Sequence, residues 1–334
     1  MISDTYRRTG ADLPFGDPRR PHGVAMEGWF WRFTHPGSGD VAVVLAGVNR
    51  DGAGRAWGTV GLAAHPGGLA ASALVADARA TADGAVAIGA GDGDAEGADG
   101  VAWLRGDARS VSVRLGAASL DVALEAPARW PRGRAFGGLG AAQAIPGLSQ
   151  YWHPWLLRAR VRGGMVVGGR EVPLDGAIAY AEKNWSNGGF PETWWWGQAH
   201  AFDADPDACV AFAGGRAGIG PLRLTATSLV VSAGGELHRL VRPLQPLRVD
   251  VGDGGWRLRG RTPAGVAVTV EGHANGTPPH LLPVPEPRAR RHRQGAAAQH
   301  LAGELRVVLR RRGRTVFDGT STLAGLERGA APTP

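Results

Sequence analysis

The sequence has a single cysteine, Cys209, among 334 residues. An internal disulfide is therefore impossible, and so is a zinc site built from several cysteine ligands. No stretch approaches 18 uninterrupted apolar residues, which excludes an ordinary membrane-spanning helix. The first twenty residues are polar and lack the apolar core of a signal peptide, so we expect a cytoplasmic protein.

Common catalytic and ligand-binding signatures are also missing. The chain contains no P-loop, no GxGxxG, no GxSxG and no HExxH, and its ten histidines form no ligand pair at helical or alternate-strand spacing. The acidic stretch DGDAEGADG (92–100) resembles a calcium loop, but Trp103 occupies the twelfth position, where a bidentate Glu is needed. We interpret that stretch as a solvated turn and expect neither a metal nor a cofactor.

Lysine is nearly absent: Lys183 is the only lysine among 37 Lys and Arg residues, and the net charge is +7. Arginines concentrate in residues 288–314, where they either form a solvated surface or make peripheral contact with an anionic membrane. No helix-turn-helix, zinc-finger or RNP-type pattern accompanies this charge, so we expect no nucleic-acid partner.

Helical periodicity is almost absent, and short runs with period-two alternation replace it. MEGWFWRFT (26–34) and ELRVVLRRRGRTVFDGTSTL (304–323) are examples, separated from their neighbours by Gly, Pro, Asp or Asn. This pattern predicts an all-β protein of about twenty strands, arranged as two packed sheets or barrels. Alternation lapses in residues 127–150, so we expect one domain at 1–135 and a second at 136–334.

The stretch YAEKNWSNGGFPETWWWGQAH (180–200) combines the lone lysine with four of the twelve tryptophans. Strand alternation places Tyr180, Glu182 and Asn184 on one face, opposite to Lys183 and Trp185. We expect this strand to form a hairpin with ETWWWGQAH through the loop SNGGFP. Glu182 would then lie among indoles, where burial raises its pKa and keeps it available as a proton donor. A buried ion pair that only organises the sheet is the alternative.

The tryptophan clusters allow two interpretations. Each tryptophan alone is typical of a hydrophobic core, because indole buries a large area and suits strands. Together, with polar groups between them, the clusters GWFW (28–31), QYWHPW (150–155) and 180–200 indicate the wall of an apolar ligand pocket.

The same stretch resembles the signature of the tocopherol cyclase family, in which EKNW is followed by a Phe-Pro turn and a strand rich in tryptophan. Further blocks agree in order along most of the chain. These are PHGVAMEGWFWRF (21–33), VPLDG (172–176), NGTPPHLLP (275–283) and AGELRVVL (302–309).

The resemblance implies two lipocalin-like antiparallel β-barrels or sandwiches. It also implies cofactor-independent, acid-catalysed cyclisation of a lipophilic substrate, a prenylated quinol or other isoprenoid, by an intramolecular cyclase of the lyase or isomerase class. In that chemistry a prenyl alkene is protonated and a phenol oxygen closes the ring. The catalytic candidates are Glu182, Glu27, Asn184 and Tyr180. The substrate-binding candidates are Trp29, Trp152, His153, Trp185, Trp194, Trp196 and Gln198.

Two other functions stay open at this point. Beside the cyclase, the alternatives are a non-catalytic, lipocalin-like carrier of an isoprenoid or other apolar ligand and a hydratase acting on an isoprenoid double bond. Lys183 has a structural role in each case: we expect it to contact an indole through a cation–π interaction, or to pair with a carboxylate in a slot too small for guanidinium.

Overall fold

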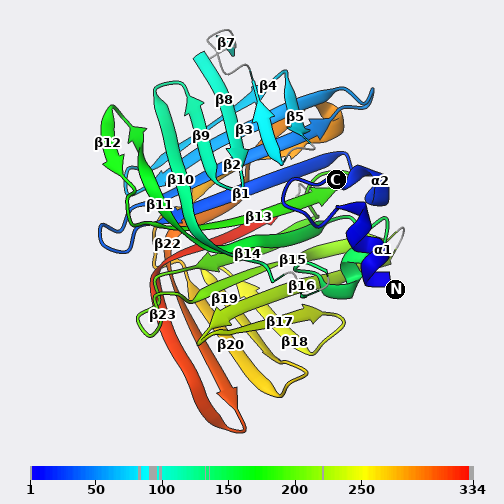
Figure 1. The fold of residues 1–334 in the computed structure, drawn as a ribbon, viewed down its shortest axis with the longest axis vertical. Coiled ribbons are helices and arrows are strands. Elements are labelled where there is room, and N and C mark those ends of the chain that lie inside the picture. Colours follow the sequence, from blue (N-terminus) through cyan, green and yellow to red (C-terminus); the bar gives the residue numbers. More distant parts are fainter. Residues whose placement is uncertain are drawn as a thin grey trace.

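The computed structural model describes residues 2–81, 84–89, 96–97, 100–131, 133–134, 136–219 and 222–330. These residues form two nearly closed, barrel-like sheets that lie one above the other (Figure 1). The all-β prediction is confirmed. The calcium-like stretch 92–100 falls largely outside the described residues.

The first sheet has thirteen strands in the order β4-β3-β2-β1-β13-β11-β10-β9-β8-β6-β5, with β12 beside β11 and β7 beside β8. Its strands are β1 (Met26–Thr34), β2 (Val41–Arg50), β3 (Ala56–His65), β4 (Leu69–Val75), β5 (Ala78–Thr81), β6 (Ala85–Ile88), β7 (Glu96–Gly97), β8 (Gly100–Asp107), β9 (Ser110–Leu115), β10 (Ala118–Arg129), β11 (Tyr151–Val167), β12 (Arg170–Pro173) and β13 (Ile178–Ser186).

The second sheet has ten strands in the order β17-β16-β15-β14-β23-β22-β20-β19-β18, with β21 beside β22. Its strands are β14 (Thr193–Ala199), β15 (Cys209–Ile219), β16 (Leu222–Ala233), β17 (Glu236–Arg242), β18 (Leu247–Gly252), β19 (Gly255–Arg261), β20 (Val266–His273), β21 (His280–Glu286), β22 (Arg291–Arg311) and β23 (Arg314–Ala330). The short helices are α1 (Ile2–Thr9), α2 (Arg19–His22) and the 3₁₀ turns Gly140–Ala144 and Pro287–Ala289. None of the helices in the described part of the chain has the length and apolar character needed to cross a bilayer.

The expected hairpin between β13 and β14 does not form. β13 pairs with β1 and β11 in the first sheet, whereas β14 pairs with β15 and β23 in the second. The chain therefore changes sheets between Ser186 and Thr193, later than the division predicted at residue 135. As a statement about independent domains, the limits 1–135 and 136–334 stay a prediction.

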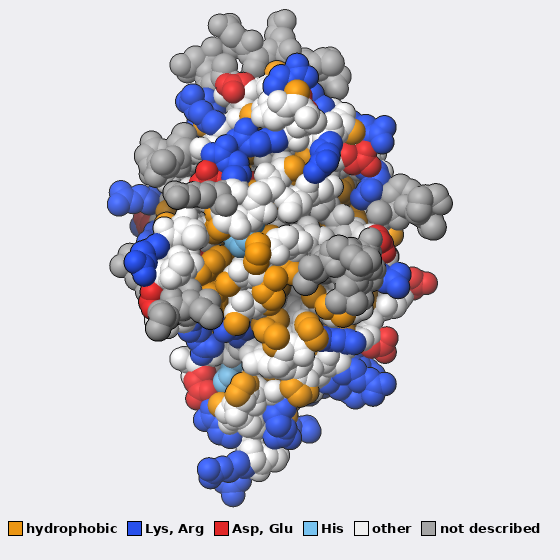
Figure 2. Space-filling view, turned by 90° about the vertical axis from the view of Figure 1, so that its right-hand side faces the viewer, with side chains coloured by type: hydrophobic (Ala, Val, Ile, Leu, Met, Phe, Trp, Pro, Cys, Tyr) orange, Lys and Arg blue, Asp and Glu red, His pale blue; other side chains and the backbone are white. Residues whose placement is uncertain are grey.

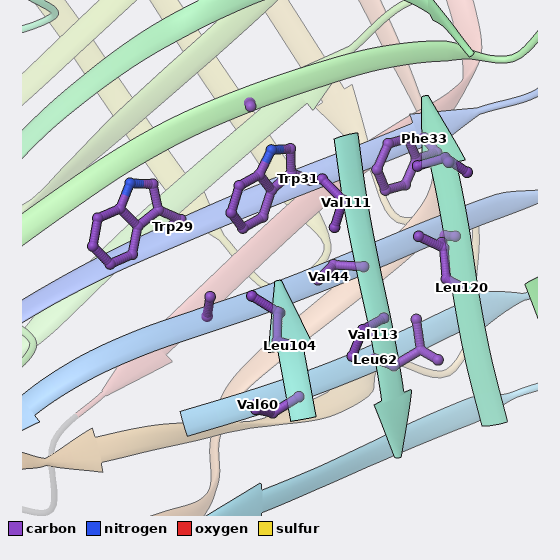
Figure 3. Close-up of a cluster of buried hydrophobic side chains, with 14 of the residues drawn as sticks. Trp29, Trp31, Phe33, Val44, Val60, Leu62, Leu104, Val111, Val113 and Leu120 are labelled. Atoms are coloured by element: carbon purple, nitrogen blue, oxygen red, sulfur yellow. The ribbon is translucent and has the colours of Figure 1, made fainter. Parts of the chain in front are cut away.

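Strand β1 is buried along its whole length, because each of its faces packs against a different core. Trp29, Trp31 and Phe33 point together into the core of the first barrel, beside Val44, Leu62 and Leu104 (Figure 3). Phe30, on the opposite face, packs in a separate cluster between the two sheets with Trp196. A strand covered on both faces reads as a nearly continuous apolar run, which explains MEGWFWRF.

The core packing around Trp31 generates a stability prediction. Trp31→Ala removes a fully buried indole and leaves a cavity, so we expect the free energy of unfolding to fall by about 3–5 kcal/mol in urea titrations. Leu244→Ala is the control, because the side chain of Leu244 is 57% exposed and its truncation should change stability by less than about 0.5 kcal/mol. Equal effects of the two substitutions would contradict this description of the core.

Candidate active site

A cavity lies between the two sheets and contains about 1190 Å³ of empty space, its open part included. Strands β1 and β13 contribute one wall, and β14, β21, β22 and β23 contribute much of the other. The lining is mainly apolar and aromatic, with a few polar groups, as is usual for the binding site of a small molecule. The polar side chains along it are Thr59, Gln150, Glu182, Asn184, Gln299 and Glu327.

Glu182 lies on the face of β13 that is turned toward the second sheet. Its Oε2 accepts a hydrogen bond from the hydroxyl of Tyr180 (2.7 Å) and another from Nε1 of Trp196 (2.9 Å). Burial in this apolar setting raises the pKa of Glu182 to about 7, although both hydrogen bonds favour the charged form and oppose the shift. A carboxyl group with this pKa is available as an acid near neutral pH.

Trp152 on β11 is a second indole near this carboxyl group. Its Nε1 is buried and makes no hydrogen bond within the described residues. The N–H dipole still favours the charged form of Glu182 and lowers its pKa, but less than the bonds from Tyr180 and Trp196 do. The sequence therefore placed the carboxyl group correctly among indoles, although these come from two sheets and not from one hairpin.

A second buried carboxyl group, Glu327 on β23, lines the same cavity. Its Oε1 accepts a hydrogen bond from Nε1 of Trp194 (2.6 Å), and its Oε2 accepts one from Nε2 of Gln299 (3.0 Å). Burial raises the pKa of Glu327 to about 7, the bond from Trp194 lowers it, and the charge of Glu182 raises it further. The cavity thus holds two carboxyl groups, each bound by an indole of β14.

Several polar atoms along the cavity are buried without a hydrogen-bond partner in the described residues. They comprise three amide oxygens and two indole nitrogens: Oδ1 of Asn184, Oε1 of Gln150 and Gln299, and Nε1 of Trp152 and Trp195. Unpaired buried polar groups are uncommon in folded proteins and carry a desolvation penalty. These acceptors and donors are therefore available to hydroxyl or carbonyl groups of a ligand.

Most of the predicted pocket residues meet at this cavity. Glu182, Asn184, Trp152, Trp194 and Trp196 line it, and Tyr180 lies next to it through its bond to Glu182. Trp29 also borders the cavity, but its indole packs in the core of the first barrel (Figure 3).

Glu27, the other predicted acid, is not among the residues that line the cavity. Its Oε1 lies 2.6 Å from Nζ of Lys183, and both side chains are buried. Burial raises the pKa of Glu27 and lowers that of Lys183, while each charge stabilises the other. The structure therefore separates Glu27 from Glu182 and places it in an ion pair.

Lys183 makes both kinds of contact that the sequence predicts. Its Nζ lies 5.2 Å from the ring centroid of Trp185 and 5.8 Å from that of Trp29. It also donates hydrogen bonds to the carbonyl oxygens of Leu13 (3.2 Å) and Gly16 (2.8 Å). The ammonium group thereby holds the N-terminal segment against β1 and β13.

Three other substrate-binding candidates lie away from the cavity lining. Trp185 stacks on Tyr151 with an interplanar angle of 6°, and its Nε1 donates to Nδ1 of His22. His153 is buried beside Trp130, and burial lowers its pKa to about 3.

Gln198 is the third of these candidates. It bonds to His200 and accepts from Arg32, so its amide belongs to a polar network behind the cavity.

Sequence reasoning missed Glu327, Gln299 and Gln150. The available signal for Glu327 was the alternation Gly325-Glu327-Gly329, where small residues flank one acid on the same face of the strand. This pattern alone does not identify a site residue. Only the structure shows that Glu327 lies opposite Trp196 in the pair of strands β14 and β23. Within the described residues, no group of three or more His, Cys, Asp or Glu side chains converges as a metal site.

The slot around Lys183 leads to a prediction about charge and size. Lys183→Arg should lower the free energy of unfolding by about 2–4 kcal/mol, because a planar guanidinium cannot reproduce the bonds to Glu27, Leu13 and Gly16 in this enclosed space. Lys183→Met should cost about 3–5 kcal/mol, since it leaves the carboxylate of Glu27 buried and unpaired. The double variant with Glu27→Gln should regain part of that loss in urea titrations. Wild-type stability of Lys183→Arg would refute a special role for lysine.

The pKa of Glu182 gives a prediction about stability and pH. Between its ordinary value of 4.5 and about 7, the folded state binds a proton that the unfolded state has lost, so the wild-type free energy of unfolding falls as pH rises through this window. Glu182→Gln should reduce this fall by about 2–3 kcal/mol between pH 5 and pH 8 in urea titrations. Glu171→Gln, an exposed control on β12, should leave it unchanged. Parallel pH curves for wild type and Glu182→Gln would contradict the assignment.

Comparisons with known proteins agree with the fold. A solved structure of CghA with Sch210972 matches with a TM-score of 0.55 and 12% identity, over 93% of this chain and 90% of that chain. Kievitone hydratase from Nectria haematococca matches with a TM-score of 0.53 and 12% identity, over 96% and 92%. At this identity the likeness shows the fold, and it confirms two lipocalin-like barrels.

No curated protein is a significant match to the sequence. The family model described as tocopherol cyclase-like matches residues 140–330, more than half of the chain. That range contains Glu182, Glu327 and all of β14. The chain belongs to the tocopherol cyclase-like family.

Proposed function

We propose that the protein catalyses the acid-promoted cyclisation of a lipophilic substrate that carries a double bond, such as a prenylated quinol. The observation that carries this proposal is Glu182, a buried carboxyl group with a pKa of about 7 that faces an aromatic cavity. Protonation of an alkene requires an acid that stays neutral in a water-poor site, and burial supplies that state.

The hydrogen bonds of Glu182 define which oxygen delivers the proton. Oε2 already accepts from Tyr180 and Trp196, so in the neutral acid the proton resides on Oε1. Transfer from Oε1 to an alkene carbon leaves a carboxylate whose negative charge the same two donors stabilise. The hydrogen bonds therefore strengthen as the proton leaves, which lowers the barrier of this step.

The indoles of the cavity match the cation that forms next. Trp152, Trp194 and Trp196 line the cavity, and their π faces attract positive charge while they exclude water. An oxygen nucleophile of the same substrate then closes the ring. Asn184 lines the cavity two residues from Glu182 on β13, and its unpaired Oδ1 can accept the hydroxyl hydrogen of that nucleophile and orient it.

Hydration is the second candidate function. The unpaired oxygens of Gln150 and Gln299 provide sites where a water molecule can be held at the cavity wall. One solved structure with this fold is named kievitone hydratase. In this alternative the same acid protonates the double bond, and water replaces the internal hydroxyl as nucleophile.

Contact with an anionic membrane through residues 288–314 stays a prediction, as does a cytoplasmic location. Four of these arginines pair with acids: Arg291 and Arg293 with Glu286, Arg306 with Asp318, and Arg311 with Glu236. On the face that carries α1 and α2, hydrophobic side chains gather near the middle with arginines above and below them (Figure 2). This arrangement is compatible with a lipophilic substrate that arrives from a lipid surface.

The test is incubation of the purified protein with prenylated quinols, followed by mass spectrometry. A product of unchanged mass and shifted retention supports cyclisation, and a gain of one water supports hydration. Unchanged ligand would mean that the protein is a carrier. Glu182→Gln should reduce kcat by at least about 10²-fold, because it removes the proton donor and keeps the shape of the side chain.

Two variants control this experiment. Glu171→Gln, on the exposed surface, should leave kcat unchanged. Glu27→Gln should keep turnover when the protein is folded, because Glu27 does not line the cavity. Loss of turnover in Glu27→Gln combined with full activity in folded Glu182→Gln would transfer the acid role to Glu27.

A further inference from the structure

We infer that Glu327 is a second catalytic residue, the base that takes the proton from the attacking oxygen while Glu182 supplies the proton to the double bond. The inference rests on the proposed function and adds a role that the acid alone does not fill. Ring closure by a hydroxyl group, or addition of water, produces an oxygen that must lose a proton. A site with only one carboxyl group has no separate acceptor for it.

The position of Glu327 meets the first requirement of that role. Glu327 and Glu182 line one cavity from opposite sheets, and Glu327 stands directly across the strand pair from Trp196, the indole that binds Glu182. Trp194, two residues earlier on β14, binds Glu327. One strand therefore holds both carboxyl groups through alternate tryptophans on the same face.

The hydrogen bonds distinguish the two groups. At Glu182, the hydrogen bonds from Tyr180 and Trp196 are both accepted by Oε2. The proton of the neutral acid can therefore reside on Oε1 without breaking either bond. At Glu327 both oxygens accept, Oε1 from Trp194 and Oε2 from Gln299. An indole N–H only donates, and the carboxylate is the form of Glu327 that satisfies both donors at once. The geometry favours Glu182 as the protonated member and Glu327 as the ionised member.

Gln299 allows Glu327 to change state during the reaction. When Oε2 of Glu327 gains a proton, it becomes a hydrogen-bond donor. Rotation of the Gln299 amide group by about 180° then turns the Oε1 of Gln299 toward Glu327, where it accepts this hydrogen bond. Oε1 of Gln299 is buried and has no partner within the described residues, so it is free for this purpose. The base thus has a partner for each of its two protonation states.

The backbone of β23 is shaped to hold this arrangement. A side chain at Gly329 would overlap the indole ring of Trp194, and one at Gly325 would lie 3.0 Å from Trp196 and 2.9 Å from Arg32. The indole of Trp194 therefore packs directly on the backbone of Gly329, where it can reach Glu327. The alternation Gly325-Glu327-Gly329 places the carboxyl group between the two indoles.

Among the residues that the structure describes, no cationic side chain forms an ion pair with Glu327. Glu182 lines the same cavity from β13, Arg32 of β1 lies close to Gly325, and His300 lies on β22; Arg328, next in sequence, pairs with Asp253. Arg32 donates to Thr34, Gln198 and backbone carbonyls, not to Glu327.

The two carboxyl groups are electrostatically coupled. The pKa of each is raised to about 7 by burial, and a negative charge on Glu182 would raise that of Glu327 further, so the pair resists losing both protons. The hydrogen bonds, not this coupling, select the member that keeps the proton. Near neutral pH such a pair carries about one proton, which is the state that provides an acid and a base together.

The proposed cycle balances in atoms and protons. The Oε1–H bond of Glu182 breaks and a C–H bond forms with the electrons of the alkene. The hydroxyl oxygen of the substrate forms a C–O bond to the resulting cation, and its O–H bond breaks as the proton passes to Oε2 of Glu327. Substrate and product are isomers, no electrons are exchanged, and return of the proton from Glu327 to Glu182 restores the enzyme.

The kinetic test uses the full chain and the prenylated quinol that it converts. Wild-type kcat should follow a bell-shaped pH profile, because Glu327 must be ionised and Glu182 protonated. Glu327→Gln should lower kcat about 10²–10⁴-fold with KM changed much less, and its residual activity should no longer fall at low pH. Glu327→Asp should keep the bell shape at reduced kcat, which covers the case in which Glu327→Gln does not fold.

The pH profile separates catalysis from a purely structural role. Wild-type kcat in Glu327→Gln, or a reduced kcat with an unchanged bell-shaped profile, would overturn the base assignment. Absence of any turnover by the wild type would instead overturn the proposed function together with the base role, so the two failures are distinguishable.

An infrared titration of the carboxyl C=O band tests the assigned states without turnover. The Glu182→Gln variant keeps only Glu327 of the buried pair, and the Glu327→Gln variant keeps only Glu182. Glu327 in the first variant should titrate at a lower pH than Glu182 in the second. Adding Gln299→Leu to Glu182→Gln should move the step of Glu327 to higher pH, because it removes the donor to Oε2. Coincident steps, or steps in the reverse order, would overturn the assignment of Glu327 as the ionised member.

Discussion

The guanidinium group of Arg32 ties the two sheets of the molecule together. It projects from β1 of the first sheet and donates to the backbone carbonyls of Leu301 (2.7 Å) and Leu323 (2.6 Å) in the second. Complete burial lowers the pKa of Arg32 to about 9, so the link is made by a group that is still charged at neutral pH. Because this link keeps the sheets in contact at one place, the faces of β13 and β14 meet beside it and enclose the cavity.

The division of β1 and β13 between two faces explains the composition of the site. Their odd-numbered side chains, including Glu27, Trp29 and Lys183, belong to the first barrel, and even-numbered ones such as Glu182 face the second sheet. The signature EKNW therefore serves two purposes at once. Its glutamate and asparagine border the cavity, while its lysine and tryptophan hold the barrel and the N-terminal segment in place.

Much of the fold and half of the site could be predicted from the sequence. Alternation alone indicated an all-β chain, and it placed Glu182 and Lys183 on opposite faces because side-chain direction in a strand depends only on parity. It could not indicate which strands pair, so β13 and β14 were expected in one hairpin although they lie in different sheets. Glu327 was missed for the same reason: about 130 residues of chain separate it from the indole that binds it.

The solitary lysine also makes the folded chain chemically simple. Lys183 is completely buried, so the described surface offers no lysine amine to an acylating reagent, whereas the unfolded chain offers one. Its ammonium is covered by the segment whose carbonyls it binds, Leu13 and Gly16. The rate of acylation at Lys183, followed on the peptide that contains it, therefore reports how often that segment separates from the barrel.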